Sequence, residues 1–325
     1  MSHADVPVGV NEQLQESPSP MQEPIAYLNG QYVPISQCVL RVFDMGVTQG
    51  VAVTDLLRTF HGKPYRIQDH LGRFYRSCKY AHLDPTVNLE ESEAITHHLI
   101  KHNSTLAPGQ ELALIYYITA GENAVYAGSA SVSEEPKPTY VQHTFPLPFH
   151  LWRQMFREGV RCATPSPRHW PPQSLSSKIK HRNRLHMWIG QKEIQATDPG
   201  AMPLYLDIHG NITETSGSNF VIYSGGKVIS PRRPNILWGI SLTVLTEILA
   251  EMGIPFVEDD IQTYDVVNAD EAWVPTSPYC LGPVVQINGT AIGDGKPGPM
   301  WRKILDHWSK IVGKDIYAET AEAVE

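Results

Sequence analysis

The sequence has neither a long apolar run nor a surplus of basic residues, and each absence excludes a class of protein. No run of roughly 18 or more apolar residues occurs, so a membrane-spanning helix is not expected. The formal net charge of -8 at pH 7 gives no basic field to attract nucleic acid or an anionic membrane surface. The N-terminus lacks the basic, apolar and small residues of a secretory signal. We therefore predict a cytoplasmic protein that binds neither nucleic acid nor membranes.

Cysteine is scarce, and its spacing excludes the usual cysteine-based sites. The 4 cysteines include no CxxC pair, which favours reduced thiols over a disulfide framework or a structural zinc. The 14 histidines include no HExxH or similar metal-ligand spacing. We expect no metal site.

The length of 325 residues is comfortable for two domains. Residues 1–24 are rich in Ser, Pro, Gln and Glu, and we interpret them as a disordered tail without a catalytic role. Prolines punctuate the chain near residue 147, which favours a domain boundary there. The expected division is a small N-terminal α/β domain at 25–146, a linker at 147–152 and a larger C-terminal domain at 153–325.

Turn signals and periodicity predict the N-terminal elements. A hairpin is expected around Asn29-Gly30, and Asp69 is a plausible N-cap for a helix with Leu71, Phe74 and Cys78 on one stripe. The remaining elements are a strand pair at 41–60, a helix at 91–103 and a strongly apolar strand at 111–119. Together these elements predict an α+β arrangement.

The C-terminal half mixes hairpins with helices. Lys180 directly precedes a helical pattern at 185–194, in which Leu185, Trp188 and Ile189 are at helical spacing. Hairpins are expected at 204–214 and 220–230, and an apolar strand at 272–274. A helix after residue 241 is expected to turn an apolar face inward, made of Leu242, Leu245, Ile248, Leu249 and Met252.

Lys180 is the first candidate for chemistry. A lysine amine is a poor nucleophile when protonated, so a catalytic lysine needs desolvation or nearby cations that lower its pKa. Arg182, Arg184 and His181 lie beside Lys180 in the sequence. The alternative is that these basic residues form a solvated face at a helix start.

Glu214 is the second candidate. A carboxylate against a pyridine nitrogen keeps that nitrogen protonated, so that the ring can absorb the electrons released when a Cα proton leaves. The alternative is that Glu214 caps a polar turn. The run 216–219 after it could supply N–H groups and hydroxyls to an anion, although such runs are also ordinary loops.

Two further segments of the sequence are typical of phosphate-binding sites. Residues 239–241 open a predicted helix, where unpaired N–H groups and the positive end of the dipole bind phosphate, although Ser241 could equally be a plain N-cap. Thr276 and Ser277 follow an apolar strand and can add a hydroxyl. Arg73 would supply a charge-assisted contact from the other domain.

These motifs, in this order, resemble the class IV (fold type IV) aminotransferases, which depend on pyridoxal 5′-phosphate (PLP). That family includes branched-chain aminotransferases, D-amino acid aminotransferases and aminodeoxychorismate lyase. The resemblance covers about residues 25–315 and rests on the segments 44–46, 70–74, 179–185, 213–220, 239–241 and 276–277.

The resemblance implies a two-domain α/β fold with the cofactor in the cleft between the domains, and a homodimer. It implies that Lys180 forms a Schiff base with PLP and moves the proton during catalysis, and that Glu214 pairs with the pyridine nitrogen. The substrates it implies are an amino acid and a 2-keto acid. The cofactor-binding residues it implies are Arg73, Lys180, Glu214, Ser218, Asn219, Ile240, Ser241 and Ser277.

The sequence also departs from the family pattern around the expected substrate pocket. Residues 125–127 read Val-Tyr-Ala where D-amino acid aminotransferases carry an Arg-x-His carboxylate trap, and Thr54 replaces an aromatic residue. Leu185 stands where branched-chain enzymes have a tyrosine, and Cys280 where a glutamate is usual. Candidate substrate residues are Thr54, Arg58 and Tyr117.

Three hypotheses follow. The leading one is a PLP-dependent aminotransferase, with a branched-chain-like amino acid as substrate. The second is a PLP lyase that releases pyruvate, because residues 180–185 resemble aminodeoxychorismate lyase most closely. The third is a protein that keeps the fold and binds a ligand or partner without catalysis, and the retention of Lys180 together with Glu214 argues against it.

Overall fold

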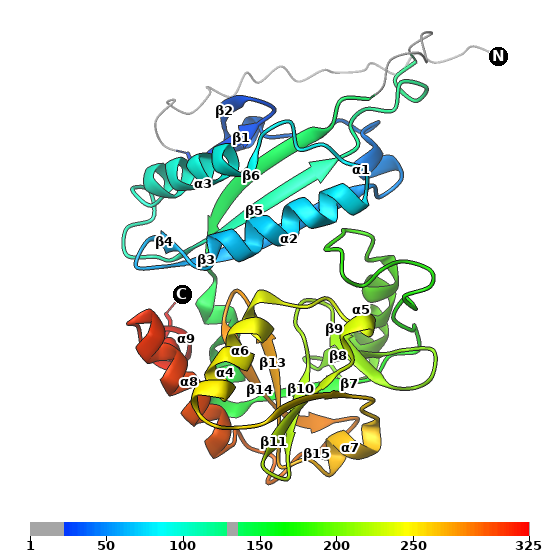
Figure 1. Ribbon diagram of the computed structural model, residues 1–325, viewed down its shortest axis with the longest axis vertical. Coiled ribbons are helices and arrows are strands. Elements are labelled where there is room, and N and C mark those ends of the chain that lie inside the picture. The colour runs from blue at the N-terminus through cyan, green and yellow to red at the C-terminus, as the bar shows by residue number, and fades with distance from the viewer. Residues whose placement is uncertain (1–22, 129–135, 325) are drawn as a thin grey trace, which may run out of the picture.

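The computed structural model describes residues 23–128 and 136–324. The tail predicted for residues 1–24 falls almost entirely outside this range. The described chain contains two β-sheets, one above the other along the long axis of the molecule, with helices packed on each (Figure 1). Every described helix is too short or too polar to span a lipid bilayer.

The first sheet is built from residues 25–146 and has the strand order β2-β1-β6-β5-β3-β4. All of its pairings are antiparallel. The predicted hairpin around Asn29-Gly30 is confirmed, as is the apolar strand β5, which is buried in the centre of the sheet. The strands are β1 (Ile25–Leu28), β2 (Gln31–Pro34), β3 (Ala52–Phe60), β4 (Lys63–Pro64), β5 (Leu112–Thr119) and β6 (Thr139–Pro146).

Helices α2 (Ile67–Tyr80) and α3 (Leu89–Asn103) pack against this sheet, while η1 (Ile35–Gln37) and α1 (Met45–Thr48) are single turns. The stripe predicted on α2 is confirmed, because Leu71, Phe74 and Cys78 are all buried in the core beneath the sheet. The N-cap prediction is wrong: Asp69 lies inside the first turn, and the cap is Arg66 in the left-handed conformation.

The strand pair predicted for residues 41–60 is also wrong in its first half. Only β3 is a long strand, and its partner across the His61-Gly62 turn is the two-residue strand β4. Residues 41–44 lead instead into α1, which Asp44 caps by accepting a hydrogen bond from the Gly46 N–H at 2.6 Å. The Asp44 side chain is buried and competes with strand pairing, since such side chains favour caps and turns.

The second sheet is nine-stranded and mixed, with the order β12-β11-β10-β13-β14-β7-β8-β9 and β15 beside β14. Both predicted hairpins are present in it. The backbone of residues 149–152 forms the turn η2, and the division into domains at 147–152 stays a prediction. The strands are β7 (Val160–Ala163), β8 (Met202–Leu206), β9 (Ile212–Thr215), β10 (Val221–Ser224), β11 (Lys227–Pro231), β12 (Phe256–Asp259), β13 (Glu271–Thr276), β14 (Cys280–Ile287) and β15 (Thr290–Ala291).

Helices surround this sheet, and the main core of the molecule lies between them and its strands. The inward face predicted for α6 is confirmed except at Met252, which is only partly buried. Helix α5 forms as predicted, but Leu185, Trp188 and Ile189 lie on its exposed side. The helices are η2 (Phe149–Trp152), α4 (Arg153–Glu158), α5 (Leu185–Thr197), η3 (Arg233–Asn235), α6 (Ile240–Glu251), α7 (Thr263–Val267), α8 (Pro299–Val312) and α9 (Ile316–Ala321).

Candidate active site

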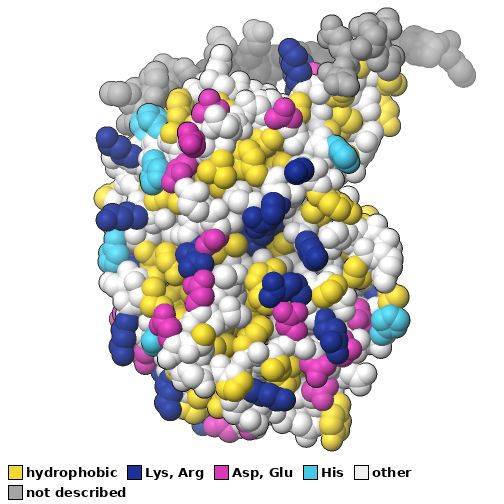
Figure 2. All heavy atoms as spheres, viewed as in Figure 1, with side chains coloured by type: hydrophobic (Ala, Val, Ile, Leu, Met, Phe, Trp, Pro, Cys, Tyr) yellow, Lys and Arg dark blue, Asp and Glu magenta, His cyan; other side chains and the backbone are white. Residues whose placement is uncertain are grey.

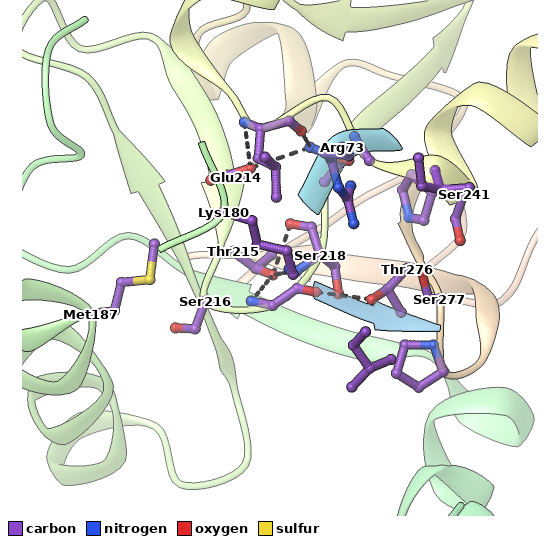
Figure 3. Close-up of a pocket in the computed structure, with 18 of the residues that line it drawn as sticks. Arg73, Lys180, Met187, Glu214, Thr215, Ser216, Ser218, Ser241, Thr276 and Ser277 are labelled. Carbon is purple, nitrogen blue, oxygen red and sulfur yellow. Dashed lines mark hydrogen bonds between the residues drawn. The ribbon is translucent and has the colours of Figure 1, made fainter. Parts of the chain in front are cut away.

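A cavity of about 260 Å³ lies where the two halves meet, and Lys180 and Glu214 both line it. Its walls come from β3 and α2 of the first half and from β9, β13 and the start of α6 in the second. Figure 3 shows Lys180 close to Glu214, with Ser241 and Ser277 to one side and Met187 to the other. The space-filling view shows an indentation at one edge of the molecule at the level between the halves (Figure 2). Both residues predicted to share one site therefore line the same cavity.

The backbone of residues 180–182 is held against strand β3 rather than within the second sheet. The Thr54 N–H donates to the Lys180 carbonyl at 2.9 Å, and the Arg182 N–H donates to the Ala52 carbonyl at 3.0 Å. Ser77 of α2 accepts from the Lys180 N–H at 3.3 Å. The first half of the chain thus fixes where a lysine of the second half enters the cavity.

Lys180 has the electrostatics expected of a reactive amine. Burial in the cavity and the charges of Arg73, Arg184 and Arg182, acting against the opposing pull of Asp55, together lower its pKa to about 7. A desolvated lysine among cations is largely neutral above that pH, and the neutral amine is the nucleophilic form. The solvated basic face is therefore not the arrangement of Lys180.

Glu214 is fixed at the opposite wall by three donors. It lies on β9, where its Oε2 accepts from the Asn219 side-chain amide at 3.3 Å and from the Leu237 N–H at 3.2 Å. Its Oε1 lies 3.1 Å from Nε2 of His169. Since a carboxylate only accepts hydrogen bonds, this contact requires a proton on Nε2.

His169 stands behind Glu214 and holds it in place. Its Nδ1 lies 3.3 Å from the Trp170 carbonyl, so both ring nitrogens face acceptors. Burial lowers the pKa of His169, but the hydrogen bond to Glu214 outweighs it and the net shift is upward. The raised pKa favours the protonated ring, which donates a charge-assisted hydrogen bond to the Glu214 carboxylate.

The start of α6 forms the anion-binding end of the cavity. The helix N-cap is Gly239, not Ser241, and no side chain caps the first turn, so the N–H groups of Ile240 and Ser241 lack intrahelical partners. Asn219 holds this turn by accepting from the Gly239 N–H at 3.1 Å. A Cβ at Gly239 would lie 2.3 Å from that Asn219 oxygen, so only glycine permits the approach. Ser277 lines the same end of the cavity.

Arg73 reaches the cavity from α2, but its charge is already balanced. Its Nε and Nη2 donate to the two oxygens of Asp55 at 2.8 Å each, and Nη1 donates to the Trp238 carbonyl at 3.3 Å. His70 Nδ1 lies 2.8 Å from the same carboxylate. Burial raises the pKa of Asp55, but Arg73 and His70 lower it by more, so Asp55 stays ionised.

The donor set fits PLP part by part. Lys180 offers an amine to its aldehyde, Glu214 a carboxylate to its pyridine nitrogen, and the first turn of α6 its N–H groups to the phosphate. The lack of a side-chain cap on α6 leaves those groups open for the phosphate. Ser218 and Asn219 also line the cavity, and both are held by neighbouring protein groups.

The predicted substrate residues lie beside the cavity and do not line it. Thr54 is buried and donates to the Tyr116 carbonyl at 2.8 Å. The guanidinium of Arg58 is paired with Glu319 at 2.8 Å and donates to the Pro278 carbonyl. Tyr117, on β5, is also absent from the cavity lining. The substrate role predicted for Arg58 therefore gains no support from its position.

Sequence reasoning missed two residues that hold the site together. Asp55 is the one carboxylate of strand β3, and a carboxylate in the middle of a predicted strand was the available signal. His169 is one of the 14 histidines of the chain and lies in a proline-rich loop. Nothing in its local sequence distinguishes it from the others. Its contact with Glu214 spans 45 residues of chain.

The fold and the donor set define a PLP enzyme of fold type IV. The branched-chain amino acid aminotransferase of Thermobaculum terrenum, solved in its PLP form, shares the fold with a TM-score of 0.77 at 18% identity, over 92% of this chain and 98% of that one. A family model described as amino-transferase class IV matches residues 52–287. The chain belongs to the class IV aminotransferases, a family that depends on PLP.

Relatives within the family carry different substrate names. Branched-chain-amino-acid aminotransferase-like protein 1 of Arabidopsis thaliana is 28% identical over 293 residues, which are 88% of this chain and 50% of that protein. The chain thus spans half the length of that relative. A D-alanine aminotransferase of Staphylococcus aureus is 27% identical over 290 residues, which are 88% of this chain and 97% of that protein.

Proposed function

We propose that this chain is an aminotransferase that moves an amino group from an amino acid to a 2-keto acid, with PLP held covalently by Lys180. The observation that carries the proposal is the pairing of a lysine whose pKa is lowered to about 7 with a fixed carboxylate, Glu214, in one cavity. A protein that only bound a ligand would have no physical need for both groups.

Each residue has a defined task in this proposal. The bound cofactor supplies the electron sink for the reaction. Lys180 would hold the cofactor and move the proton at the substrate Cα, and Glu214 would face the pyridine nitrogen. The first turn of α6, at Ile240 and Ser241, would hold the phosphate. Ser277 and Arg73 complete that end of the site.

For the amino acid, we propose a branched-chain-like side chain. Leu56 and Met187 add apolar side chains to the cavity wall, which suits an apolar substrate side chain. The similarity to branched-chain aminotransferase relatives supports the same choice. The similarity to D-alanine aminotransferases gives the competing possibility. Both enantiomers of leucine, valine and alanine should therefore be tested as donors, with 2-oxoglutarate and pyruvate as acceptors.

A substitution of Lys180 tests the central role. Purified protein should show the cofactor's absorbance band, lose it with an amino donor and recover it with a keto acid. Lys180→Ala should abolish this reversible cycle, and the exposed Lys178→Ala should leave it intact. If Lys180→Ala still bleached and recovered, the assignment of the amine would be wrong.

A PLP lyase is the second candidate, favoured by the resemblance of residues 180–185 to aminodeoxychorismate lyase. It would use the same cofactor residues but would release pyruvate from aminodeoxychorismate without an acceptor. Pyruvate should be measured with and without 2-oxoglutarate. Release that does not depend on the acceptor would replace the aminotransferase proposal.

We also propose that the enzyme is a cytoplasmic homodimer divided into domains at residues 147–152. Light scattering during size-exclusion chromatography of the full chain tests the assembly, with a mass of about twice 36.3 kDa expected. A monomer mass would contradict it.

A further inference from the structure

The C-terminal helix α9 is joined to the first half of the molecule by a buried ion pair. Nη2 of Arg58, on β3, donates to Oε2 of Glu319, on α9, at 2.8 Å. The two side chains are only 1% and 6% exposed. Figure 1 shows α9 on the second half, beside α8. The pair therefore connects elements of different halves that are 261 residues apart in the sequence.

The same guanidinium also holds a turn at the phosphate end of the main cavity. Nη1 of Arg58 donates to the Pro278 carbonyl at 3.1 Å, and Pro278 follows Ser277 in the turn between β13 and β14. Ser277 and Pro278 both line the main cavity. Arg58 thus bridges the C-terminal helix and the turn that carries Ser277.

Arg58 acts on this end of the site from behind. A cavity of about 10 Å³ is lined by Arg58, Ser241, Ser277 and Cys280, and the two serines line the main cavity as well. Arg58 lines the smaller cavity but not the main one. Any influence of its guanidinium on a ligand in the main cavity therefore passes through the turn at Ser277 and Pro278.

The turn needs such a hold because it ends in an unfavourable backbone conformation. Cys280 has a φ of 65°, in the left-handed region that residues with a Cβ rarely adopt, and its side chain is buried. A conformation of this kind persists only where neighbouring contacts enforce it. The hydrogen bond from Arg58 to Pro278, two residues before Cys280, is one of these contacts.

The guanidinium of Arg58 is itself held rigidly. Its Cζ lies 3.8 Å from the centre of the Phe60 ring and 5.1 Å from that of Phe149. Its partner Glu319 is fixed as well, because Oε1 of Glu319 lies 2.7 Å from Nζ of Lys314. A planar fork between two aromatic rings, with one acceptor on each arm, is suited to setting the position of both acceptors.

We propose that Arg58 and Glu319 are positioning residues for the cofactor phosphate: α9, acting through Arg58, holds Ser277 and the turn around it in the arrangement that binds phosphate. This inference rests on the proposed function, since it takes PLP to be the ligand of the cavity. It gives the C-terminal helix a part in cofactor binding, and it assigns Arg58 a role other than the substrate contact predicted from the sequence.

Titration of the apoprotein with PLP and with pyridoxal, which lacks the phosphate, tests the proposal. In Arg58→Met we expect the affinity for PLP to fall about tenfold and that for pyridoxal to change less than about twofold. Methionine can pack against the same aromatic rings, and Glu319 keeps Lys314 as its counter-charge. Equal losses for the two ligands, or an unchanged affinity for PLP, would overturn the proposal.

Arg153→Met is the matched control. Nη1 of Arg153 donates to the Ala323 carbonyl at 3.2 Å, just after α9, and Arg153 lines neither the main cavity nor the small one behind it. Both affinities should stay within about twofold of those of the natural protein. A loss specific to PLP in this variant would contradict a path through Arg58.

Two further variants test the two ends of the ion pair. In Glu319→Gln a single acceptor oxygen faces Arg58 and Lys314, so the preference for PLP over pyridoxal should fall. Arg58→Lys keeps the charge but not the fork that reaches both acceptors, so part of the preference should remain. An unchanged preference in either variant would contradict the bridge from α9. These titrations need no turnover, so their outcome is separate from the test of transamination.

Discussion

His169 and Glu214 form an ion pair at 3.1 Å in the wall of the cavity, with the imidazole on the carboxylate oxygen that Asn219 and Leu237 leave free. The two side chains are only 6% and 13% exposed. Both nitrogens of the ring face acceptors, so His169 is a positioning residue that fixes the orientation of the Glu214 carboxylate.

Replacing His169 should therefore weaken the reaction without removing the cofactor. His169→Ala leaves Glu214 without a charge-assisted partner, and we expect the rate of the amino-donor half-reaction to fall about tenfold. The pH dependence of the cofactor absorbance should also shift, which a purely structural defect would not produce. His209→Ala, in an exposed turn, is the control. An unchanged pH profile in His169→Ala would show that the imidazole does not act through Glu214.

Lys180 should reduce the stability of the apoprotein. Its pKa falls from an ordinary 10.5 to about 7 in the fold, so the unfolded chain binds more protons between these two pH values and the free energy of unfolding rises with pH there. Lys180→Met removes a desolvated cation, and we expect the apoprotein to gain about 1 kcal/mol at pH 7.

This gain should narrow as the pH rises toward 10.5, because the amine of the natural protein is then neutral in both states. Thermal melting of apoprotein at pH 7 and above pH 9 measures it, with Lys178→Met as the exposed control. A gain that grows with pH would contradict the lowered pKa.

Asp55 should contribute stability through Arg73. Asp55→Asn leaves the buried guanidinium without its counter-charge, and we expect a loss of about 3 kcal/mol at pH 7. The pKa of Asp55 is lowered from 3.8, so its contribution is complete above that pH and is lost as the pH falls below it. Chemical denaturation at several pH values should show the gap between variant and natural protein closing in acid. A gap that is independent of pH would contradict the ion pair.

Gly239 should be required for the phosphate end of the site. A methyl group there would lie 2.3 Å from Asn219 Oδ1, although the backbone φ of −69° suits any residue. Gly239→Ala must therefore displace Asn219 or the first turn of α6, and we expect PLP affinity to fall about tenfold. Fluorescence titration of apoprotein with PLP measures the affinity. Unchanged affinity would show that the turn does not hold the phosphate.

Local sequence signals were sufficient for the parts of the site that lie on regular elements. A glycine before an apolar helix placed the start of α6, and an Asn-Gly turn placed the first hairpin, because these conformations depend on neighbouring residues. The same reasoning failed at Asp69, because α2 begins two residues earlier, after Arg66, whose backbone is left-handed and whose side chain makes no capping hydrogen bond. Residue propensities for helix starts alone do not predict an N-cap of this kind.

The sequence by itself determined which groups are available: an amine at position 180, a carboxylate at 214 and a helix start near 239–241. Their order also determined the family. Only the tertiary structure decided which groups the arginines contact: Arg73 is paired with Asp55 and Arg58 with Glu319, whereas Arg182 donates to the Thr54 hydroxyl and Arg184 to the Ser216 carbonyl. Pairing across dozens of residues depends on distances in space, and a one-dimensional pattern does not contain them.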